Sequence, residues 1–199
     1  IYSSLCITDG ILFGSENRIY KYDYKKRSFK SINIKKQEDK GSDVTKYRVQ
    51  KIIAFSEREA LVATRRDGVY VLDYQTMRLK RLFSGSNNIL QGAYLSSNGY
   101  IYLSFWGQGL FCYEKTGKFI KRYTKENSDL TNNYVLDIVE KEGFLWLATD
   151  GGGINRLELS NENFSNLYHI AGDKNSLPVN SVTILYKDEN EGLWAGSVR

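Results

Sequence analysis

A short apolar motif recurs along the chain at intervals of about 45 residues. In each copy an apolar run ends at a small residue, and successive small residues are 49, 41, 44 and 48 positions apart. These small residues are Gly14, Ala63, Ser104, Ala148 and Gly196. A repeat of this length made of short strands is typical of β-propeller blades, whereas a helical repeat would show a period of 3.6 residues with helix caps.

The fourth copy predicts the structure of one blade. Four apolar or alternating segments, at 134–141, 144–149, 154–159 and 164–169, are separated by turn residues and are expected to form four antiparallel strands. The small residue lies in the second strand. We expect it there because neighbouring blades stack face to face, and a bulky side chain would hold them apart.

Two kinds of turn repeat as well. Dipeptides ending in glycine precede the second strand, and the glycine is expected to supply the positive φ of a tight hairpin turn. These dipeptides are Asp9-Gly10, Asn98-Gly99, Glu142-Gly143 and Glu191-Gly192. An acid begins the turn between the third and fourth strands, where an aspartate can accept hydrogen bonds from backbone amides two residues on. The acids are Asp23, Asp73, Glu114 and Glu158.

The sequence therefore predicts an all-β chain of about four and a half blades. We expect one domain over residues 1–199, with blades at about 1–47, 48–87, 88–132 and 133–179 and a partial blade at 180–199. A propeller ring closes with 4 to 8 complete blades, whereas the fifth blade of this chain is partial. The chain is therefore expected to be a fragment of a larger propeller. It would pack against the remaining blades of its parent or associate with another copy of itself.

Composition excludes several classes of protein. The 199 residues contain one His and two Cys, which cannot assemble a Cys/His zinc site and leave little scope for His-based catalysis. We expect no metal and no cofactor. The longest uninterrupted apolar run is far shorter than the roughly 20 residues of a membrane-spanning helix, so no direct membrane insertion is expected.

The net charge of +5 is concentrated in residues 21–40, which hold eight Lys and Arg against three acids. Such a segment could contact phosphate or an anionic glycan. Outward strand positions and turns are more commonly only solvated. We expect the solvated arrangement and no nucleic-acid partner.

The fourth and fifth copies carry a recognisable pattern. Phe144-Leu145-Trp146-Leu147-Ala148-Thr149 is followed by Gly152-Gly153-Ile154-Asn155-Arg156, and residues 180–197 begin another copy. This resembles the two-component-regulator propeller repeat, in which "G-x-L-W-hydrophobic-G-T" precedes "G-G-L-N-R". The first two copies depart from it, because Arg65-Arg66-Asp67-Gly68 replaces the glycine pair in the second and the first is one residue short.

The resemblance implies a function. In that family the repeats build the extracytoplasmic sensor region of hybrid two-component histidine kinases of Bacteroides-type bacteria, which sense oligosaccharides released from glycans. It implies a periplasmic chain without catalysis of its own, in a parent that signals by phosphorelay from the inner membrane. Two alternatives stay open: a purely architectural set of blades, and a lyase of the streptogramin-lyase kind, which would need an acid and a base at the channel mouth.

Ligands of propellers commonly bind where the turns between the second and third strands meet the linkers between blades. The candidate ligand-binding residues on these turns are Trp106, Gln108, Arg65, Arg66, Asp150 and Asn155, next to linkers containing Asn132, Asn133 and Asn180. An aromatic face can stack on the C–H groups of a sugar while an amide bonds its hydroxyls, and paired arginines suit a sulfate or uronate. The alternatives are that Trp106 packs between blades and that the arginines are ordinary exposed turn residues.

The remaining reactive residues are expected to be structural. The Gly151-Gly152-Gly153 run lacks the following helix and Lys-Ser/Thr pair of a phosphate loop. His169, at the end of the fourth strand, has no Ser or Cys signal beside it. Cys6 and Cys112 fall in different blades, so we expect no disulfide and interpret both as small core residues.

Overall fold

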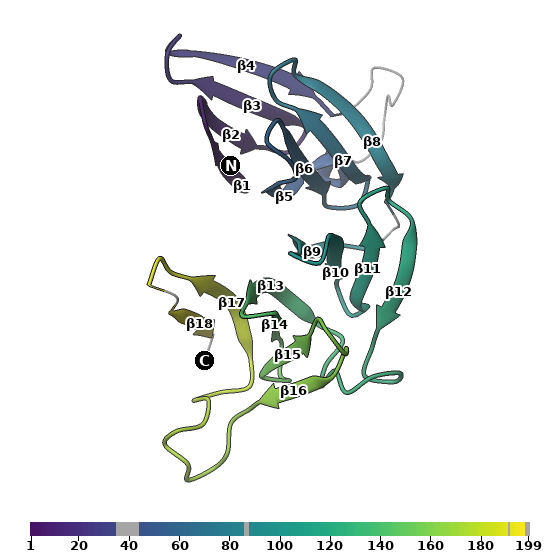
Figure 1. Ribbon diagram of the computed structural model, residues 1–199, viewed down its shortest axis with the longest axis vertical. Helices are drawn as coiled ribbons and strands as arrows, with labels where there is room; N and C mark the ends of the chain where they lie inside the picture. The colour runs from purple at the N-terminus through teal and green to yellow at the C-terminus, as the bar shows by residue number, and fades with distance from the viewer. Residues whose placement is uncertain (35–43, 86–87, 191, 198–199) are drawn as a thin grey trace. The chain divides into compact units, whose positions relative to one another are not determined.

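The computed structural model describes residues 1–34, 44–85, 88–190 and 192–197. Its strands form four antiparallel sheets of four strands and one of two, each from consecutive strands (Figure 1). The predicted all-β blades are confirmed. The strands are β1 (Ser3–Ile7), β2 (Gly10–Gly14), β3 (Arg18–Asp23), β4 (Ser28–Asn33), β5 (Val49–Ala54), β6 (Glu59–Thr64), β7 (Gly68–Asp73), β8 (Arg78–Ser84), β9 (Leu90–Leu95), β10 (Tyr100–Phe105), β11 (Gly109–Glu114), β12 (Phe119–Tyr123), β13 (Val135–Lys141), β14 (Phe144–Thr149), β15 (Ile154–Glu158), β16 (Phe164–Leu167), β17 (Val182–Lys187) and β18 (Leu193–Ser197).

The chain divides into two compact units, Ile1–Leu90 and Gln91–Arg199. The first holds blade 1 (β1–β4) and blade 2 (β5–β8), with a short 3-10 helix at Val44–Tyr47 before blade 2. The second holds blade 3 (β9–β12, apart from Leu90), blade 4 (β13–β16) and the two strands of blade 5. Across the described ranges, no helix has the length and apolar character needed to cross a bilayer.

The acid-initiated turns between third and fourth strands form as predicted in blades 1 and 2. Asp23 Oδ1 accepts the amide hydrogens of the residues two and three positions on, at 3.0 and 2.9 Å, and Asp73 Oδ1 does the same at 2.9 and 3.0 Å. These backbone hydrogen bonds lower the pKa of both carboxyls. Each turn then ends at a residue with positive φ, at Arg27 (47°) and Met77 (57°). The aspartate thus fixes the turn that aligns the outer strand.

The hairpin glycines serve two different purposes. Gly99 and Gly143 have φ of 85° and 78°, as predicted for tight turns. The expectation of positive φ is wrong for Gly10. The Glu191-Gly192 turn includes Glu191, which lies outside the described residues. Gly10 instead lies within β2, where an added Cβ would stand 1.9 Å from the carbonyl oxygen of Tyr22. That position needs glycine because two backbones approach closely, not because the turn requires a left-handed conformation.

The small residues of the second strands allow blades to stack, as predicted. In the first unit a Cβ on Gly14 would stand 2.4 Å from a methyl group of Val49, on the first strand of blade 2. The adjacent Ser3 Oγ accepts the Ile52 amide hydrogen at 2.9 Å. Val49 and Ile52 are almost wholly buried and belong with Leu12 to one hydrophobic cluster. Blade 1 is therefore joined to blade 2 by apolar packing and by one directed hydrogen bond.

Blades 4 and 5 of the second unit repeat this joint. Ala148 is buried in a cluster with Val182 and Leu185 of β17. Asp137 Oδ2 accepts the Leu185 amide hydrogen at 3.1 Å. The pairing of β17 with β18 shifts register between Val182 and Ile184, just as β5 shifts before Ile52. Such a bulge turns a backbone N–H out of its own ladder, and in both joints the preceding blade accepts an N–H just beyond the bulge.

A buried hydroxyl closes the turn after the second strand. Thr64 Oγ1 donates to the carbonyl oxygen of Gly68 at 2.7 Å and accepts the Gly68 amide hydrogen at 2.8 Å. Thr149 Oγ1 donates to the Gly153 oxygen at 2.8 Å, and that oxygen also accepts the Thr149 amide hydrogen at 3.1 Å. In blades 2 and 4 the residue after the small position therefore holds the turn that carries Arg65, Arg66 or Asp150.

The two cysteines, both free, differ in burial. Cys112 is 1% exposed, in agreement with the prediction of a core residue. Cys6 is exposed, so the prediction is wrong for this residue. Leu5 and Ile7 on either side of it pack against the core cluster of the first unit. Because side chains alternate along a strand, Cys6 lies on the opposite face of β1.

Candidate functional site

The candidate residues lie at one end of the blades, which we call the loop end: the turns between second and third strands and the linkers between blades. In the second unit the β10–β11 turn carries Trp106, and the linker into β13 ends at Tyr134. The two rings meet edge to face with centroids 5.1 Å apart. They remain 48% and 40% exposed. Gly107 between them has φ of 66°, and a Cβ added there would stand 3.3 to 3.5 Å from atoms of the Tyr134 side chain. Trp106 therefore packs on one partner while much of its surface stays open.

Gln108 is fixed in place beside this aromatic pair. The Arg122 guanidinium on β12 donates from Nε to the Gln108 carbonyl oxygen at 2.6 Å and from Nη2 to its side-chain Oε1 at 3.0 Å. Arg122 itself lies over the Phe111 ring, 5.0 Å from the centroid. Because the amide oxygen of Gln108 is bound in this way, the amide NH2 group is the part of the side chain that can donate to a ligand.

Asp150 is exposed and belongs to the same surface. Its amide hydrogen bonds to the Tyr134 carbonyl oxygen at 3.0 Å, which ties the β14–β15 turn to the linker. Its Oδ1 accepts from Ser181 Oγ at 2.6 Å, and its carbonyl oxygen accepts from Asn132 Nδ2 at 2.7 Å. The structure thus brings Trp106, Tyr134 and Asp150 together at the loop end of blades 3 and 4. A carboxylate oriented in this way can accept hydrogen bonds from hydroxyl groups.

Asn155 holds the linker inside the fold. It is completely buried, its Oδ1 accepts from the Thr131 amide at 2.8 Å, and its Nδ2 donates to Thr131 Oγ1 at 2.8 Å. Thr131 Oγ1 also donates to the Gly152 carbonyl oxygen at 2.7 Å. The asparagine of the "G-G-I-N-R" segment therefore fastens the preceding linker to the β14–β15 turn, and its side chain is closed to ligand. Gly152 itself would clash with Thr131 and Asn132 if it carried a Cβ.

The linker before β13 is further braced by Asn133. Its Nδ2 donates to both carboxylate oxygens of Glu126, at 3.3 and 3.0 Å, and this hydrogen bonding lowers the pKa of Glu126. Its Oδ1 accepts the Lys125 amide hydrogen at 2.9 Å. The segment that positions Tyr134 is thus preorganised by its own side chains.

Arg65 and Arg66 belong to the first unit, in the β6–β7 turn. Both are half-buried, and the Arg65 amide donates to the Arg48 carbonyl oxygen at 2.7 Å. Arg66 Nε is buried and has no hydrogen-bond partner among the described atoms. The remaining candidate residues lie in the second unit, so the six predicted residues are divided between the two units.

His169 was predicted to end the fourth strand of blade 4, but β16 ends at Leu167 and His169 lies in the loop after it. Its Nδ1 lies 2.8 Å from the Leu177 carbonyl oxygen, and its amide donates to Asn180 Oδ1 at 2.6 Å. These contacts fasten the linker between blades 4 and 5. Within the described part of the chain, no cluster of His, Cys, Asp and Glu is arranged to hold a metal ion.

The basic segment departs from expectation at one residue. Lys21 was expected to be solvated but is 6% exposed, because its ammonium is bonded to Asp9 Oδ2 at 2.7 Å and to the Tyr74 carbonyl oxygen at 3.2 Å. Lys25 and Lys26 are exposed turn residues, as expected. The part of the segment at 35–40 lies outside the described residues.

Sequence reasoning missed Tyr134, which follows two asparagines in a linker. The signal that could have found it is position: the linker joins the blades at the same end as the Trp106 turn, and an aromatic residue there is out of place in a polar run.

Comparison with known proteins identifies one repeat directly. The family model for the two component regulator propeller matches residues 129–151, which run from the linker through β13 and β14. No curated protein matches the chain in sequence.

Solved structures share the fold. An extracellular domain ascribed to a hybrid two component system of B. thetaiotaomicron is 20% identical with a TM-score of 0.75, over 98% of this chain and 27% of that one. A second such domain from the same organism is 18% identical with a TM-score of 0.75, over 98% and 28%. The computationally designed protein Ika8 is 13% identical with a TM-score of 0.65, over 99% and 55%. The chain thus spans about a quarter of the length of the two extracellular domains. It has the β-propeller blade fold, and residues 129–151 carry a two-component-regulator propeller repeat.

Proposed function

We propose that this chain is part of the extracytoplasmic, periplasmic sensor region of a hybrid two-component system and that its loop end binds a glycan-derived oligosaccharide. Three observations support the proposal: the repeat at residues 129–151, the likeness in fold to extracellular domains of such systems, and the open aromatic surface at the loop end. In this proposal the chain itself catalyses nothing, and a kinase elsewhere in the parent protein carries the phosphorelay.

The observation that carries the ligand part is the pair formed by Trp106 and Tyr134. Exposed aromatic rings are costly to leave in water, and loop aromatics held by a rigid scaffold are commonly binding residues. Beside them the Gln108 amide supplies donors and the Asp150 carboxylate supplies acceptors. A sugar has the matching surfaces: C–H faces that stack on a ring, and hydroxyls at its edge that both donate and accept.

The test is calorimetry with a panel of neutral and acidic oligosaccharides. Saturable heat is expected from at least one member, and Trp106→Ala should weaken that binding about tenfold or more, as for a central aromatic contact. Phe119→Ala is the matched control, because Phe119 is also an exposed aromatic of the second unit but begins β12, at the opposite end of blade 3. Binding that is unchanged in Trp106→Ala would remove the site from this surface. No heat from any sugar would favour the architectural role.

A specific observation favours that architectural role as the second candidate. On blade 5 the residues Ile184, Tyr186 and Trp194 share one face of β17–β18 and are 57%, 61% and 64% exposed. The corresponding face of blade 4 carries Val139 and Trp146, and both pack against the cluster that includes β17. The exposed face therefore has the layout of one that another blade covers.

The occupant this face fits is the first strand of a further blade. In blades 2, 4 and 5 that strand carries an aliphatic pair three residues apart: Val49 and Ile52, Val135 and Ile138, Val182 and Leu185. Within one chain these three pairs are already buried, so the first strand that a second copy could present to this face is β1 of blade 1, which has exposed positions. Light scattering across a concentration series should show self-association, and Trp194→Glu should reduce it. A monomer at every concentration would contradict this role.

A further inference from the structure

A groove lies between blades 3 and 4 at the end of the blades opposite to the loop end. Here the turns between first and second strands and between third and fourth strands meet, and we call it the hairpin-end groove. Its enclosed part has a volume of about 90 Å³, and an adjoining open part has about 420 Å³. The two parts share Asn98, Glu158 and Leu159 as lining residues.

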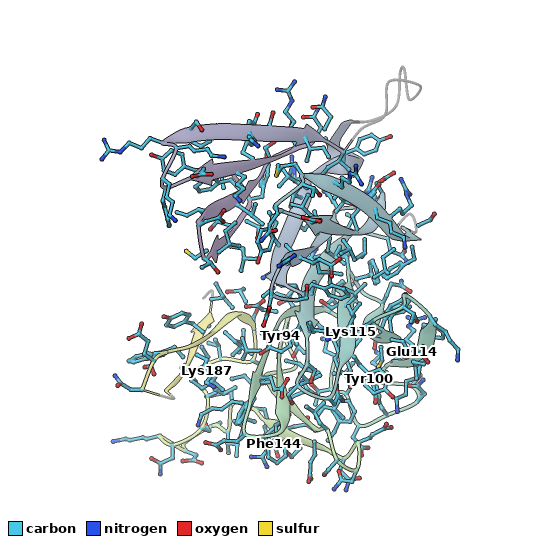
Figure 2. All side chains as sticks on the ribbon, turned by 45° about the horizontal axis from the view of Figure 1, so that its top comes forward. Tyr94, Tyr100, Glu114, Lys115, Phe144 and Lys187 are labelled. Atoms are coloured by element: carbon cyan, nitrogen blue, oxygen red, sulfur yellow. The ribbon has the colours of Figure 1, made fainter. Side chains whose placement is uncertain are left out.

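The enclosed part has an aromatic floor and a charged wall. Tyr102, Cys112 and Tyr123 form the floor, and burial raises the pKa of all three side chains, so that they stay protonated. On the wall the Lys121 ammonium pairs with the Glu162 carboxylate of blade 4 and lies over the Tyr123 ring, 5.3 Å from its centroid. Tyr100 at the rim of the enclosed part and Phe144 in the open part are both labelled in Figure 2.

The corresponding place between blades 1 and 2 is occupied by a lysine. Leu12, Lys21 and Lys30 lie side by side on β2, β3 and β4, and in blade 3 the same row reads Tyr102, Cys112 and Lys121. Cys112 therefore stands at the position of Lys21. The Lys21 side chain lies buried, with its ammonium bonded to Asp9 and to the Tyr74 carbonyl oxygen and 5.7 Å from the Tyr74 ring centroid.

The neighbouring blade presents equivalent groups in both places. Tyr74 follows the turn acid Asp73, and Leu159 follows the turn acid Glu158. The Tyr74 and Leu159 amides each donate to a carbonyl oxygen of their own blade's first hairpin, at 3.2 and 3.0 Å. The backbone carbonyl that receives the Lys21 ammonium thus has a counterpart in Leu159, at the groove where the short Cys112 replaces the lysine.

Size and charge define the ligand. A cavity of roughly 150 Å³ holds benzene, so the enclosed part, at about 90 Å³, is too small for a six-membered ring and suits a slender chain. Three carboxylates line the two parts, and two of them are paired: Glu142 with Lys141 and Glu162 with Lys121. Glu158 is the carboxylate of the groove that has no ion pair among the described residues, so one negative charge is in excess. Aromatic faces and excess carboxylate favour a cation.

We propose that the hairpin-end groove binds a primary ammonium group carried on a slender aliphatic chain, which takes the place that Lys21 fills in blade 1. Its source is either a free alkylamine or a lysine side chain. The site is separate from the loop end and does not depend on the oligosaccharide proposal.

The test uses n-butylammonium as the probe, with 1-butanol as its neutral counterpart, in calorimetry on the whole chain. The ammonium should bind saturably, and the alcohol should not bind at the same concentration. Cys112→Lys places a lysine inside the groove at the position that Lys21 has in blade 1 and should weaken binding by about tenfold or more, whereas Cys112→Ser, which leaves the cavity open, should retain it. A second readout is alkylation of Cys112 in the Cys6→Ser protein, which the bound ammonium should slow.

Equal binding of alcohol and ammonium, or binding unaffected by Cys112→Lys, would overturn the proposal. If Cys112→Lys fails to fold, Glu158→Gln together with Glu162→Gln tests the same site from partly exposed positions, and unchanged affinity in that double variant would also overturn it. N-acetyl-lysine methylamide distinguishes the two sources, because a lysine side chain should bind with the probe's sensitivity to Cys112→Lys and a site for free amines only should not accept it. Trp106→Ala should leave ammonium binding unchanged, which separates this site from the loop end.

Discussion

The buried hydroxyls of Thr64 and Thr149 occupy the same position in two blades but make different hydrogen bonds. The Thr64 hydroxyl accepts the buried Gly68 amide hydrogen as well as donating to the Gly68 oxygen. The Thr149 hydroxyl only donates, to a Gly153 oxygen that the Thr149 amide also reaches. Replacing each by valine keeps the side-chain shape and removes the hydroxyl. The two substitutions should therefore have unequal costs.

The magnitudes follow from these contacts. Loss of one hydrogen bond costs about 0.5–1.5 kcal/mol, and a buried amide left without a partner adds about 1–3 kcal/mol. Thr149→Val loses only the first of these, so its expected cost is about 1 kcal/mol. Thr64→Val loses both, so its expected cost is about 2–4 kcal/mol. With a urea m-value of about 1–3 kcal/mol/M, Thr64→Val should lower the unfolding midpoint by about 1 M or more.

Urea unfolding followed by far-UV circular dichroism measures both variants. The three tryptophans, at 106, 146 and 194, all lie in the second unit, so fluorescence follows Thr149→Val separately. Thr64→Ser is the control, because it keeps the hydroxyl and loses only the methyl group. The reasoning is refuted if Thr64→Val costs no more than Thr149→Val, or if Thr64→Ser costs as much as Thr64→Val.

Three further predictions use the same assay. Ser3→Ala should cost about 1–3 kcal/mol, because the buried Ile52 amide loses its acceptor, whereas Ser4→Ala at the exposed neighbour should be neutral; equal costs would contradict the inter-blade joint. Asp73→Asn should destabilise the protein at neutral pH. The difference in free energy of unfolding from wild type should shrink as the pH falls below 3.8, the ordinary pKa of an aspartate carboxyl. The sign follows because a lowered folded-state pKa gives stability that is present above the unfolded pKa and lost as pH falls through the folded one; a pH-independent difference would rule this out. Gly143→Ala should cost about 1–2 kcal/mol because φ is 78°, although its Cβ would meet nothing within 4 Å; a neutral result would show that the turn can relax.

The sequence repeat predicts the blades well because each strand is short, apolar and bounded by turn residues that have one local role. Asp23 and Asp73 fulfil that role by accepting hydrogen bonds from backbone amides of their own turns, and all of these residues are neighbours in the sequence. Cys6 and Cys112 could not be distinguished, because their burial depends on which face of the strand has a neighbour. The prediction for Gly10 failed for a similar reason, because its need for glycine comes from the close approach of the neighbouring strand β3.

The candidate site was predictable only in part. Trp106 and Asp150 lie on turns that the repeat places at one end, so their proximity follows from topology. The buried role of Asn155 depends on Thr131, which is 24 positions away. The hairpin-end groove escaped prediction altogether, because its lining comes from several strands and turns and each residue is ordinary where it stands. The groove becomes apparent only when the row Leu12, Lys21 and Lys30 is aligned with the row Tyr102, Cys112 and Lys121. The alignment shows the short Cys112 at the position of the long Lys21.

The joint between blades has a consequence for symmetry. One face of a blade presents a small residue, such as Gly14 or Ala148, and the next blade meets it with an aliphatic pair, such as Val49 and Ile52. The two surfaces differ, so the contact is heterologous, and two copies related by a two-fold axis would set small residue against small residue and leave a gap. Association through these faces therefore runs in one direction only, and it ends in a closed ring or continues as an open filament.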